Sequence, residues 1–449
     1  MMQKFDAFLG KLAYTLWDTK EGGQRLAEYK RLNTQERLPR ESLIELQTAK
    51  LNELIRHAYK TSSWYRDIIN KAGINPELPI TLDDLQQFPV TTKIDIRENT
   101  DAFISSRYQK DDLNSAKTGG STGVSLNLFF DERCQQFRNA AQMYADGFAN
   151  WRPGLRVAAV WGNPPVAKTS KQKLRAYLLD RTIFLDTMDL NPESMGTFVQ
   201  RWRSFLPQVV FGHAHSIYIF AKYLVEHKIH TLRPRGVVTT SMMLLEHERQ
   251  TIEMAFGCKV TNRYGCEEVG LIAVECEKHN GMHINSPHII LETLDANDKP
   301  VAAGEPGKIV VTDLNNYGMP LIRYRVEDVG VVSERQCSCG RSTPMLERLE
   351  GRVADFLKKP DGGQVAGVSL VERTLTKIPG VEQMQLVQED LHEIIINRVK
   401  GKEFAATTDQ QLLHEFRVVF GDDIKLTLRD ISKIPQEASG KYRFSICKI

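Results

Sequence analysis

The sequence contains no long apolar run, no excess of either charge, no internal repeat and no low-complexity tract. The longest apolar-looking stretch, 209–225, includes His213, His215 and Lys222, which are costly to bury in a bilayer. We therefore expect no transmembrane segment. Lys and Arg number 59 and Asp and Glu number 56, a difference of +3, so charge indicates no nucleic-acid partner. With 449 residues, 41% hydrophobic and 26% charged, the composition excludes collagen-like, coiled-coil and disordered proteins.

The first twenty residues do not have the pattern of a secretory signal, because Asp6 and Lys11 interrupt their apolar part and no small-residue cleavage pattern follows. Their apolar residues recur at helical spacing: Phe5, Phe8, Leu9, Leu12, Leu16 and Trp17. A helix packed on the main body is the favoured interpretation, and a peripheral membrane helix is the alternative. Seven cysteines, an odd number without a signal sequence, indicate a reducing compartment and a cytoplasmic protein.

Three patterns divide the chain. Residues 1–100 are predicted to be helical, with an apolar stripe along 41–59 and a helix over 81–87. Residues 101–351 alternate short apolar runs with helical stretches, and this indicates an α/β sheet with helices on its faces, followed by a β-rich part from 292 to 332. Residues 352–449 show the order αββαβ, which predicts a small α+β domain.

The most informative local segment is Lys117–Gly123, which holds three glycines and three hydroxyl residues. The backbone amides and side chains of such a loop can donate to the oxygens of phosphate groups. It is not a Walker A loop, because no Gly-Lys-Ser/Thr follows. Taken alone, a plain turn is the commoner explanation.

Four further segments follow this loop in order: RYGCEE at 263–268, IRYRVED at 322–328, GRVAD at 351–355 and PQEASGK at 435–441. Together with the loop, the series resembles the core motifs of the adenylate-forming superfamily of acyl-CoA synthetases, luciferases and peptide-synthetase adenylation domains. Within it, the chain is similar to the phenylacetate-CoA ligase branch, which includes related proteins encoded with capsular polysaccharide genes. The segments PVTTKIDIR at 89–97 and NNYGMPLIRYR at 315–325 carry the same similarity.

The resemblance implies an α/β fold with a large N-terminal part and a small mobile C-terminal lid domain. It implies an ATP- and Mg²⁺-dependent enzyme that converts a small-molecule carboxylic acid, with an aryl acid as one guess, to an acyl-adenylate and passes the acyl group to coenzyme A. The alternative acceptor is an amine or hydroxyl, such as an amino sugar of a surface polysaccharide, or a carrier-protein thiol. A third interpretation is a non-catalytic binding protein on the same scaffold. The branch also implies a homodimer.

The resemblance further implies which residues bind the nucleotide. The residues expected around the β- and γ-phosphates are Thr118, Gly119, Gly120, Ser121, Thr122 and Gly123. Tyr264, followed by Gly265, would stack on adenine. Asp328 would accept hydrogen bonds from the ribose hydroxyls, and Arg352 would add a charged contact.

Two residues are expected to act in catalysis. Glu268 would hold Mg²⁺, which prefers hard oxygen ligands, and Lys441 would bridge the carboxylate and the α-phosphate. The sequence departs from the family pattern where Glu267 replaces a usual hydroxyl residue, and where Ala354 replaces the first acid of the hinge motif. The identity of the hinge residue is therefore left open.

The acyl pocket of the family corresponds to segments around 211–215 and 239–244 in this chain. His213, Ser241 and Met242 are therefore pocket candidates. A core histidine and a core methionine are equally good interpretations of His213 and Met242.

The cysteines give a separate signal. Cys276 precedes the turn pair Asn280-Gly281, and a hairpin there would place it beside His283. Cys337 and Cys339 supply two more thiols, and three cysteines with one histidine make a tetrahedral structural zinc set. His279 is a competing fourth ligand, and buried cysteines without a metal are the alternative.

Overall fold

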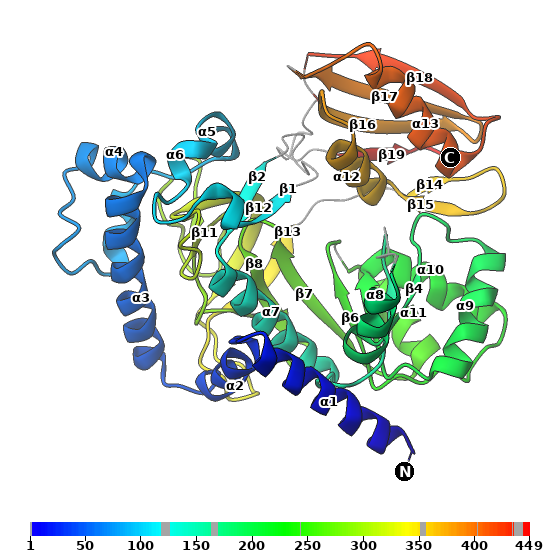
Figure 1. Ribbon diagram of the computed structural model, residues 1–449, viewed down its shortest axis with the longest axis horizontal. Coiled ribbons are helices and arrows are strands. Elements are labelled where there is room, and N and C mark those ends of the chain that lie inside the picture. Colours follow the sequence, from blue (N-terminus) through cyan, green and yellow to red (C-terminus); the bar gives the residue numbers. More distant parts are fainter. Residues whose placement is uncertain are drawn as a thin grey trace.

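The computed structural model describes residues 2–117, 126–162, 169–242, 244–350, 356–401, 403–432, 434 and 443–449. Within these ranges the chain folds around an eleven-stranded sheet, and a four-stranded sheet formed late in the chain lies apart from it (Figure 1). Among the described helices, none combines the length and the apolar character that a membrane span requires.

One half of the large sheet is parallel. Its strands are β3 (Val157–Val160), β4 (Thr182–Leu185), β5 (Val209–His213), β6 (Gly236–Thr240) and β7 (Val260–Cys266). They lie in the order β4-β3-β5-β6-β7, so the chain adds strands on both sides of β3. Helices α9 (Pro192–Phe205), α10 (Ala214–Glu226) and α11 (Glu246–Phe256) form with these strands one apolar core that contains Val210, Phe220 and Val237. The predicted alternation of strands and helices is confirmed.

The other half of the large sheet is antiparallel. Its strands are β8 (Gly270–Glu275), β9 (Met282–Ile284), β10 (Ile289–Leu294), β11 (Pro306–Asp313), β12 (Tyr324–Ser333) and β13 (Met345–Glu350). They continue from β7 in the order β8-β9-β13-β12-β11-β10. The β-rich segment expected from 292 to 332 is therefore hydrogen-bonded into the same sheet as the α/β strands.

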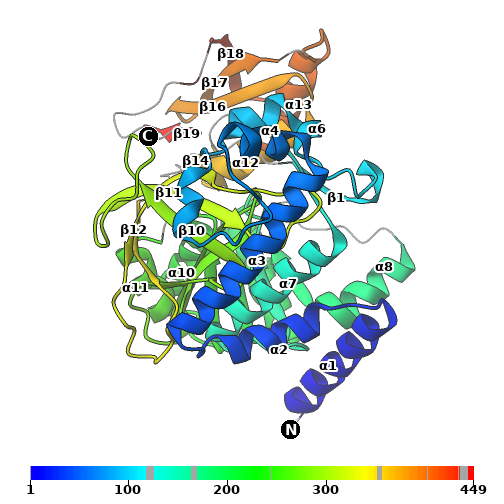
Figure 2. The ribbon, with the colours of Figure 1, turned by 90° about the vertical axis from the view of Figure 1, so that its left-hand side faces the viewer.

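Helices dominate the first part of the chain, and Figure 2 shows α2, α3 and α7 along one side of the molecule. The elements are α1 (Met2–Lys20), α2 (Arg25–Gln35), α3 (Arg40–Thr61), α4 (Ser63–Lys71), η1 (Asp83–Gln87), α5 (Lys93–Glu98), α6 (Thr100–Phe103), η2 (Lys110–Asp112), β1 (Asn114–Lys117), β2 (Asn127–Phe130), α7 (Glu132–Asp146), η3 (Gly147–Ala149), α8 (Ser170–Arg175) and η4 (Ala176–Asp180). The stripe predicted along 41–59 is the buried face of α3, with Leu51, Leu54 and Ile55 fully buried. The helix expected over 81–87 is the shorter 3₁₀ helix η1, because the backbone and hydroxyl of Thr81 bind the Asp84 carboxylate ahead of it.

The last part of the chain has its own sheet and core. Its elements are β14 (Phe356–Lys358), β15 (Gln364–Ala366), α12 (Gly367–Lys377), β16 (Val381–Asp390), β17 (Glu393–Lys400), α13 (Thr408–Phe420), β18 (Lys425–Asp430) and β19 (Ser445–Cys447). The order αββαβ from α12 to β18 is as predicted, and the sheet runs β18-β17-β16-β19. Leu386, Ile394 and Phe416 are buried in its core.

Candidate active site and a thiol–imidazole cluster

The carboxylate of Glu268 is buried at the turn between β7 and β8, with 5% of the residue exposed. The Tyr324 hydroxyl donates to Glu268 Oε1 at 2.9 Å, and Lys93 Nζ lies 3.4 Å from the same oxygen. Burial raises the pKa of Glu268, but the Lys93 charge and the hydrogen bonds outweigh it and hold this pKa below its usual range. Glu268 is therefore an ionised carboxylate at neutral pH.

Lys93 reaches Glu268 from the N-terminal helical region. Thr91 forms a parallel bridge to Tyr324, and Thr91 and Arg325 hydrogen-bond through their backbones at 2.9 Å. Thr92 and Asp95 then form a capping box that begins α5 at Lys93. Sequence reasoning noted this segment but assigned Lys93 no role. The available signal was a lysine in the first helical turn, where the helix dipole disfavours a cation unless an anion lies nearby.

The two residues expected around the nucleoside are hydrogen-bonded to each other. The Tyr264 hydroxyl, on β7, donates to Asp328 Oδ2, on β12, at 2.8 Å. Between Tyr264 and Glu268, a Cβ on Gly265 would lie 2.4 Å from the carbonyl oxygen of Gly270, so only glycine fits there. The structure thus places Tyr264 on β7 and Glu268 at the turn that follows, and each is hydrogen-bonded to a side chain of β12, Asp328 and Tyr324 respectively.

The remaining nucleotide candidates lie outside the described residues. They are Thr118, Gly119, Gly120, Ser121, Thr122, Gly123, Arg352 and Lys441. The strands that flank the glycine-rich segment, β1 and β2, pair antiparallel, with Lys117 opposite Asn127. Glu267 has a side chain that is 55% exposed and lies 3.9 Å from the Arg138 guanidinium.

His213 ends β5 at the point where the strand order reverses. In open α/β sheets this switch point, outside the carboxyl ends of the strands, is the usual ligand site. The centroids of the His213 and Trp161 rings are 4.2 Å apart, and Trp161 follows β3. Burial lowers the pKa of His213 to about 4, so its imidazole is neutral. Sequence reasoning missed Trp161, although its position directly after a buried strand was visible.

Ser241 and Met242 follow β6 beside this region. Ser241 is exposed and has φ +66°, a left-handed conformation that a non-glycine residue adopts at some cost in strain. Met242 is half-buried and packs against the core of the parallel half-sheet. The contacts of Met242 are those of a core residue, and its partly exposed side chain also agrees with a position at the edge of a pocket.

A cleft of about 240 Å³ lies at the amino ends of the parallel strands, where it is lined by the first residues of β3, β4 and β5, Val157, Thr182 and Val209. Phe211 of β5 also lines the cleft and stacks on Trp161 with ring centroids 5.2 Å apart. The cleft also contains an ion pair in which Arg263 Nη1 donates to Asp146 Oδ1 at 2.8 Å. The cleft therefore lies away from the carboxyl ends of these strands, and its lining does not include His213, Ser241 or Met242.

At the far end of β8, the structure brings together Cys276, His283, Cys337 and Cys339. The three thiol sulfurs and the imidazole lie within 4.8 Å of one another, and all four residues are buried. The predicted hairpin supplies two of them, because β8 and β9 pair antiparallel with Glu275 opposite Met282. Cys276 Sγ and Cys337 Sγ are 3.7 Å apart, and Cys339 Sγ is 3.2 Å from His283 Nε2.

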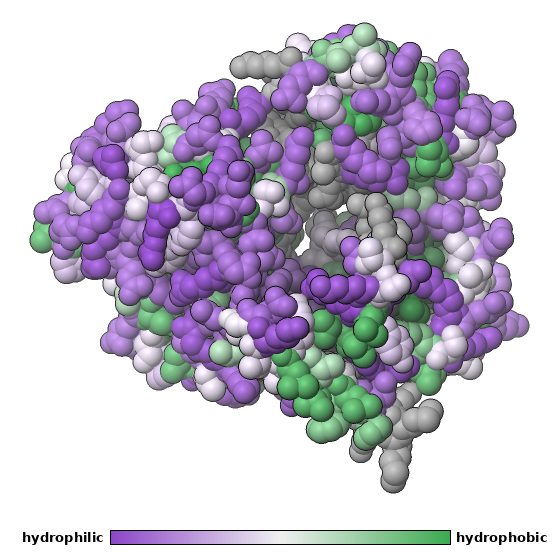
Figure 3. Space-filling view, viewed as in Figure 1, coloured by the Kyte–Doolittle hydropathy of each residue, from purple (hydrophilic) through white to green (hydrophobic). Residues whose placement is uncertain are grey.

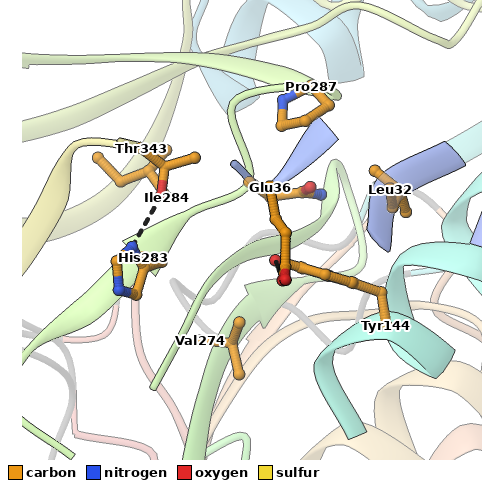
Figure 4. Close-up of a pocket in the computed structure, with 9 residues that line it drawn as sticks. Leu32, Glu36, Tyr144, Val274, His283, Ile284, Pro287 and Thr343 are labelled. Carbon is orange, nitrogen blue, oxygen red and sulfur yellow. Dashed lines mark hydrogen bonds between the residues drawn. The ribbon is translucent and has the colours of Figure 1, made fainter. Parts of the chain in front are cut away.

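These distances fit a tetrahedral zinc site. Zinc–sulfur bonds of about 2.3 Å place two thiolates about 3.8 Å apart, close to the separation of Cys276 and Cys337. His283 Nδ1 lies 2.8 Å from Thr343 Oγ1 (Figure 4), so this nitrogen is engaged outside the cluster and Nε2 is the one that faces the thiols. The adjoining cavity, about 10 Å³, has room for about one water molecule.

The protein around the cluster changes the pKa values of its thiols and its imidazole, and the competing histidine, His279, lies elsewhere. Burial raises the pKa of the Cys276 thiol, whereas hydrogen bonds from Arg341 hold the pKa of Cys339 below its usual range despite burial. Burial also lowers the pKa of His283 to about 4, so its imidazole is neutral as a ligand must be. His279 lies outside the cluster, 3.4 Å from Glu275 Oε2.

The sequence is similar to those of known proteins. A model described as the CapK C-terminal domain matches residues 357–448. Protein CapK of Staphylococcus aureus is 27% identical over 415 residues, covering 91% of this chain and 90% of CapK. Phenylacetate-coenzyme A ligase of Thermus thermophilus is 26% identical over 366 residues, covering 77% of this chain and 78% of the ligase.

The fold is that of a solved ligase. The crystal structure of 2-hydroxyisobutyryl-CoA ligase with 2-HIB-AMP and CoA superposes with a TM-score of 0.62 at 20% identity, covering 92% of each chain. The motif order, the large sheet and the similarity over nine-tenths of the chain agree with one another. The chain is therefore similar over most of its length to CapK and to the phenylacetate-coenzyme A ligases, and it has the fold of 2-hydroxyisobutyryl-CoA ligase.

Proposed function

We propose that this protein is an acid–thiol ligase that uses ATP to activate a small carboxylic acid as an acyl-adenylate and then transfers the acyl group to coenzyme A. The observation that carries the proposal is the buried, ionised Glu268, which pairs with Lys93 of α5 and accepts a hydrogen bond from Tyr324 of β12, while Asp328 of the same strand accepts one from Tyr264. Relatives named as phenylacetate-coenzyme A ligases support the reaction class.

In the first step a carboxylate oxygen of the substrate attacks the α-phosphorus of ATP, the bond to pyrophosphate breaks, and no protein nucleophile is needed. The chain contributes position and charge. Tyr264 would bind adenine, Asp328 the ribose, and residues 118–123 the outer phosphates. Glu268 fits a magnesium ligand, since it is an oxygen donor kept ionised by Lys93; the ion would supply positive charge beside the phosphates.

In the second step the thiol sulfur of coenzyme A attacks the acyl carbon, AMP leaves, and the thiol proton passes to solvent. The proposed acid, an aryl or other small acid, would lie at the switch point beside His213 and Trp161, with Ser241 and Met242 at its edge. The neutral, buried imidazole of His213 can donate a hydrogen bond without attracting a second proton.

The experiment is pyrophosphate release from ATP and Mg²⁺ across aryl, short-chain and amino-acid carboxylates, with and without coenzyme A. Turnover that needs one acid and coenzyme A supports the ligase. Turnover without coenzyme A dependence identifies the alternative acceptor, an amine, hydroxyl or carrier thiol. ATP binding with no turnover on any acid contradicts the proposal and favours a binding protein.

Lys441→Ala separates the half-reactions. We expect it to abolish adenylation but to spare thioester formation from supplied acyl-adenylate, because its proposed role is on the α-phosphate. Lys448→Ala is the matched control, since Lys448 is exposed and pairs with Glu389. Equal loss of both half-reactions would contradict the role.

We also propose that Cys276, His283, Cys337 and Cys339 hold a structural zinc ion. Four protein ligands would fill all four coordination positions of the ion and leave none for a substrate, so its role would be to stabilise the fold. Zinc analysis of purified protein should give about one equivalent per chain, and Cys337→Ser should lose it. Cys258→Ser is the control, because Cys258 lies outside the cluster.

We propose that residues 352–449 form the lid domain on residues 1–351. The separate core around Leu386 and Phe416 and the family match over 357–448 support this division. The seven free cysteines suit a reducing, cytoplasmic setting, where ATP and coenzyme A are available.

A further inference from the structure

Helix α1 presents its apolar residues to solvent. Five of them are 44–63% exposed: Phe5, Phe8, Leu9, Leu12 and Leu16. Their spacing places them on one side of the helix. The favoured expectation, that these residues pack on the main body, is therefore wrong for all five.

The side of α1 that faces the protein is held by polar contacts. Asp6 pairs with both Arg156 and Arg181. One turn later Gly10 lies so close to the chain that a Cβ would come within 2.8 Å of the Gly154 carbonyl oxygen. These contacts fix the rotation of the helix, and so they turn its apolar stripe outward.

The apolar surface continues onto the neighbouring elements α8 and η4. Leu174, Tyr177 and Leu178 are 58%, 67% and 39% exposed, and Arg175 lies over the Trp17 ring of α1 at 5.1 Å. In Figure 3 hydrophobic side chains gather along the lower edge of the molecule, where α1 runs. Contiguous apolar patches on a protein surface mark interaction sites, whereas single exposed residues do not.

Basic residues surround this patch. The exposed ones on α1, α8 and their ends are Lys11, Lys20, Lys171, Lys173 and Arg175. The exposed acidic groups of the same segments are Glu21 and Asp180, because Asp6 and Asp18 are engaged with arginines. An apolar helix face bordered by positive charge has the character of a helix that lies in the headgroup region of an anionic bilayer.

We propose that the α1 face, defined by Phe5, Phe8, Leu9, Leu12 and Leu16 with Leu174, Tyr177 and Leu178, docks the protein on the surface of an anionic membrane. The apolar stripe enters the boundary of headgroups and acyl chains, and the lysines contact lipid phosphates. A second copy of the chain is a poorer occupant, because a two-fold contact would bring the two sets of basic residues together.

The test is co-sedimentation with vesicles of phosphatidylcholine alone or mixed with phosphatidylglycerol. The full chain should bind the mixed vesicles and release at high salt. The double variant Phe8→Ser, Leu12→Ser should lose about tenfold or more of this binding, since two apolar side chains no longer leave water. Lys171→Gln with Lys173→Gln should lose the preference for phosphatidylglycerol.

The matched control is Met254→Ser with Val418→Ser, which removes two apolar side chains of similar exposure, 60% and 66%, from other helices. It should bind vesicles as the unmodified chain does. All variants should keep their melting temperature, and vesicle binding is measured without an enzyme assay, so the result is independent of the ligase assignment.

Two results would overturn the proposal. One is no binding of the unmodified chain to mixed vesicles, or equal binding by the Phe8, Leu12 variant. The other is a dimer in solution that this variant converts to a monomer without any vesicle binding, which would assign the face to a second copy.

Discussion

Strand β8 carries a different buried cluster at each end. Glu268, at its start, joins Lys93 and Tyr324 in a charged set, while Cys276, after its end, joins two thiols and an imidazole. Six residues of extended chain, about 20 Å, separate the two. The charged set is joined to the Tyr264–Asp328 pair through β12, whereas the ligand atoms offered by the three thiols and the imidazole lie within 4.8 Å of one another.

The comparison shows that one strand can connect a charged cluster suited to catalysis with a thiol–imidazole cluster suited to stabilising the fold. A charged pair buried without enough partners is a weak source of stability, but it holds a carboxylate ready for a cationic ligand. A complete set of soft ligands adds stability and leaves no position for a substrate. Changes at the first cluster should therefore alter activity and its pH dependence, and changes at the second should alter metal content.

The largest effect is expected from Glu268→Gln. Adenylation should fall about a thousandfold, because the neutral amide no longer places negative charge where the metal and the phosphates meet. Pyrophosphate release measures it, with Glu267→Gln as the exposed neighbour that should change the rate little. Full activity of the Glu268 variant would remove the carboxylate from the mechanism.

Lys93→Met should cost about 3 kcal/mol of unfolding free energy, since it leaves the buried Glu268 charge without its partner. The pKa of Glu268 lies below its usual range in the unmodified chain, so the carboxylate contribution is lost only when pH falls through that low value. In the variant, burial dominates and raises the pKa of Glu268. The acid limb of the activity profile should therefore move to higher pH.

Urea unfolding and a pH–rate profile measure these two changes. The control is Lys110→Met, which breaks the exposed pair with Asp101 and should change stability by less than about 1 kcal/mol. An unchanged acid limb in the Lys93 variant would show that this lysine does not set the pKa of Glu268.

Thr343→Val tests the second cluster without touching a ligand. It removes the hydroxyl that contacts His283 Nδ1 and orients the ring, and zinc affinity should fall about tenfold to a hundredfold. Competition with a chelator measures the affinity, and Ser342→Ala is the neighbouring control. Pyrophosphate release should stay the same. If it fell together with zinc affinity, the two clusters at the ends of β8 would not be independent.

The smallest effect is expected from Tyr264→Phe. It removes the hydrogen bond to Asp328, worth about 1 kcal/mol, and should raise the KM for ATP about fivefold while the ring still stacks. Tyr59→Phe removes a comparable exposed bond to Asn70 and should leave the KM unchanged. An unchanged KM for the Tyr264 variant would contradict the placement of the nucleoside.

Sequence reasoning selected Tyr264, Glu268 and Asp328 as candidates through the order of motifs, and the four thiol–imidazole residues through a turn pair and a Cys-x-Cys spacing; the structure brings the members of each set close together. It missed Lys93, Tyr324 and Trp161, although two of the three lie in segments that carried the family resemblance. Their roles depend on contacts between segments far apart in the chain, such as the bridge from Thr91 to Tyr324. Such pairings leave little trace in local patterns.

The sequence by itself determined the periodic elements, the order αββαβ near the C-terminus and the motif series, because these depend on side-chain spacing within short segments. Tertiary structure alone decided that the β-rich strands join the large sheet and that α1 turns its apolar side outward. The first outcome depends on the pairing of β9 with β13, and the second depends on the ion pairs of Asp6 with Arg156 and Arg181. These contacts join residues far apart in the sequence, so they form only when the whole chain folds.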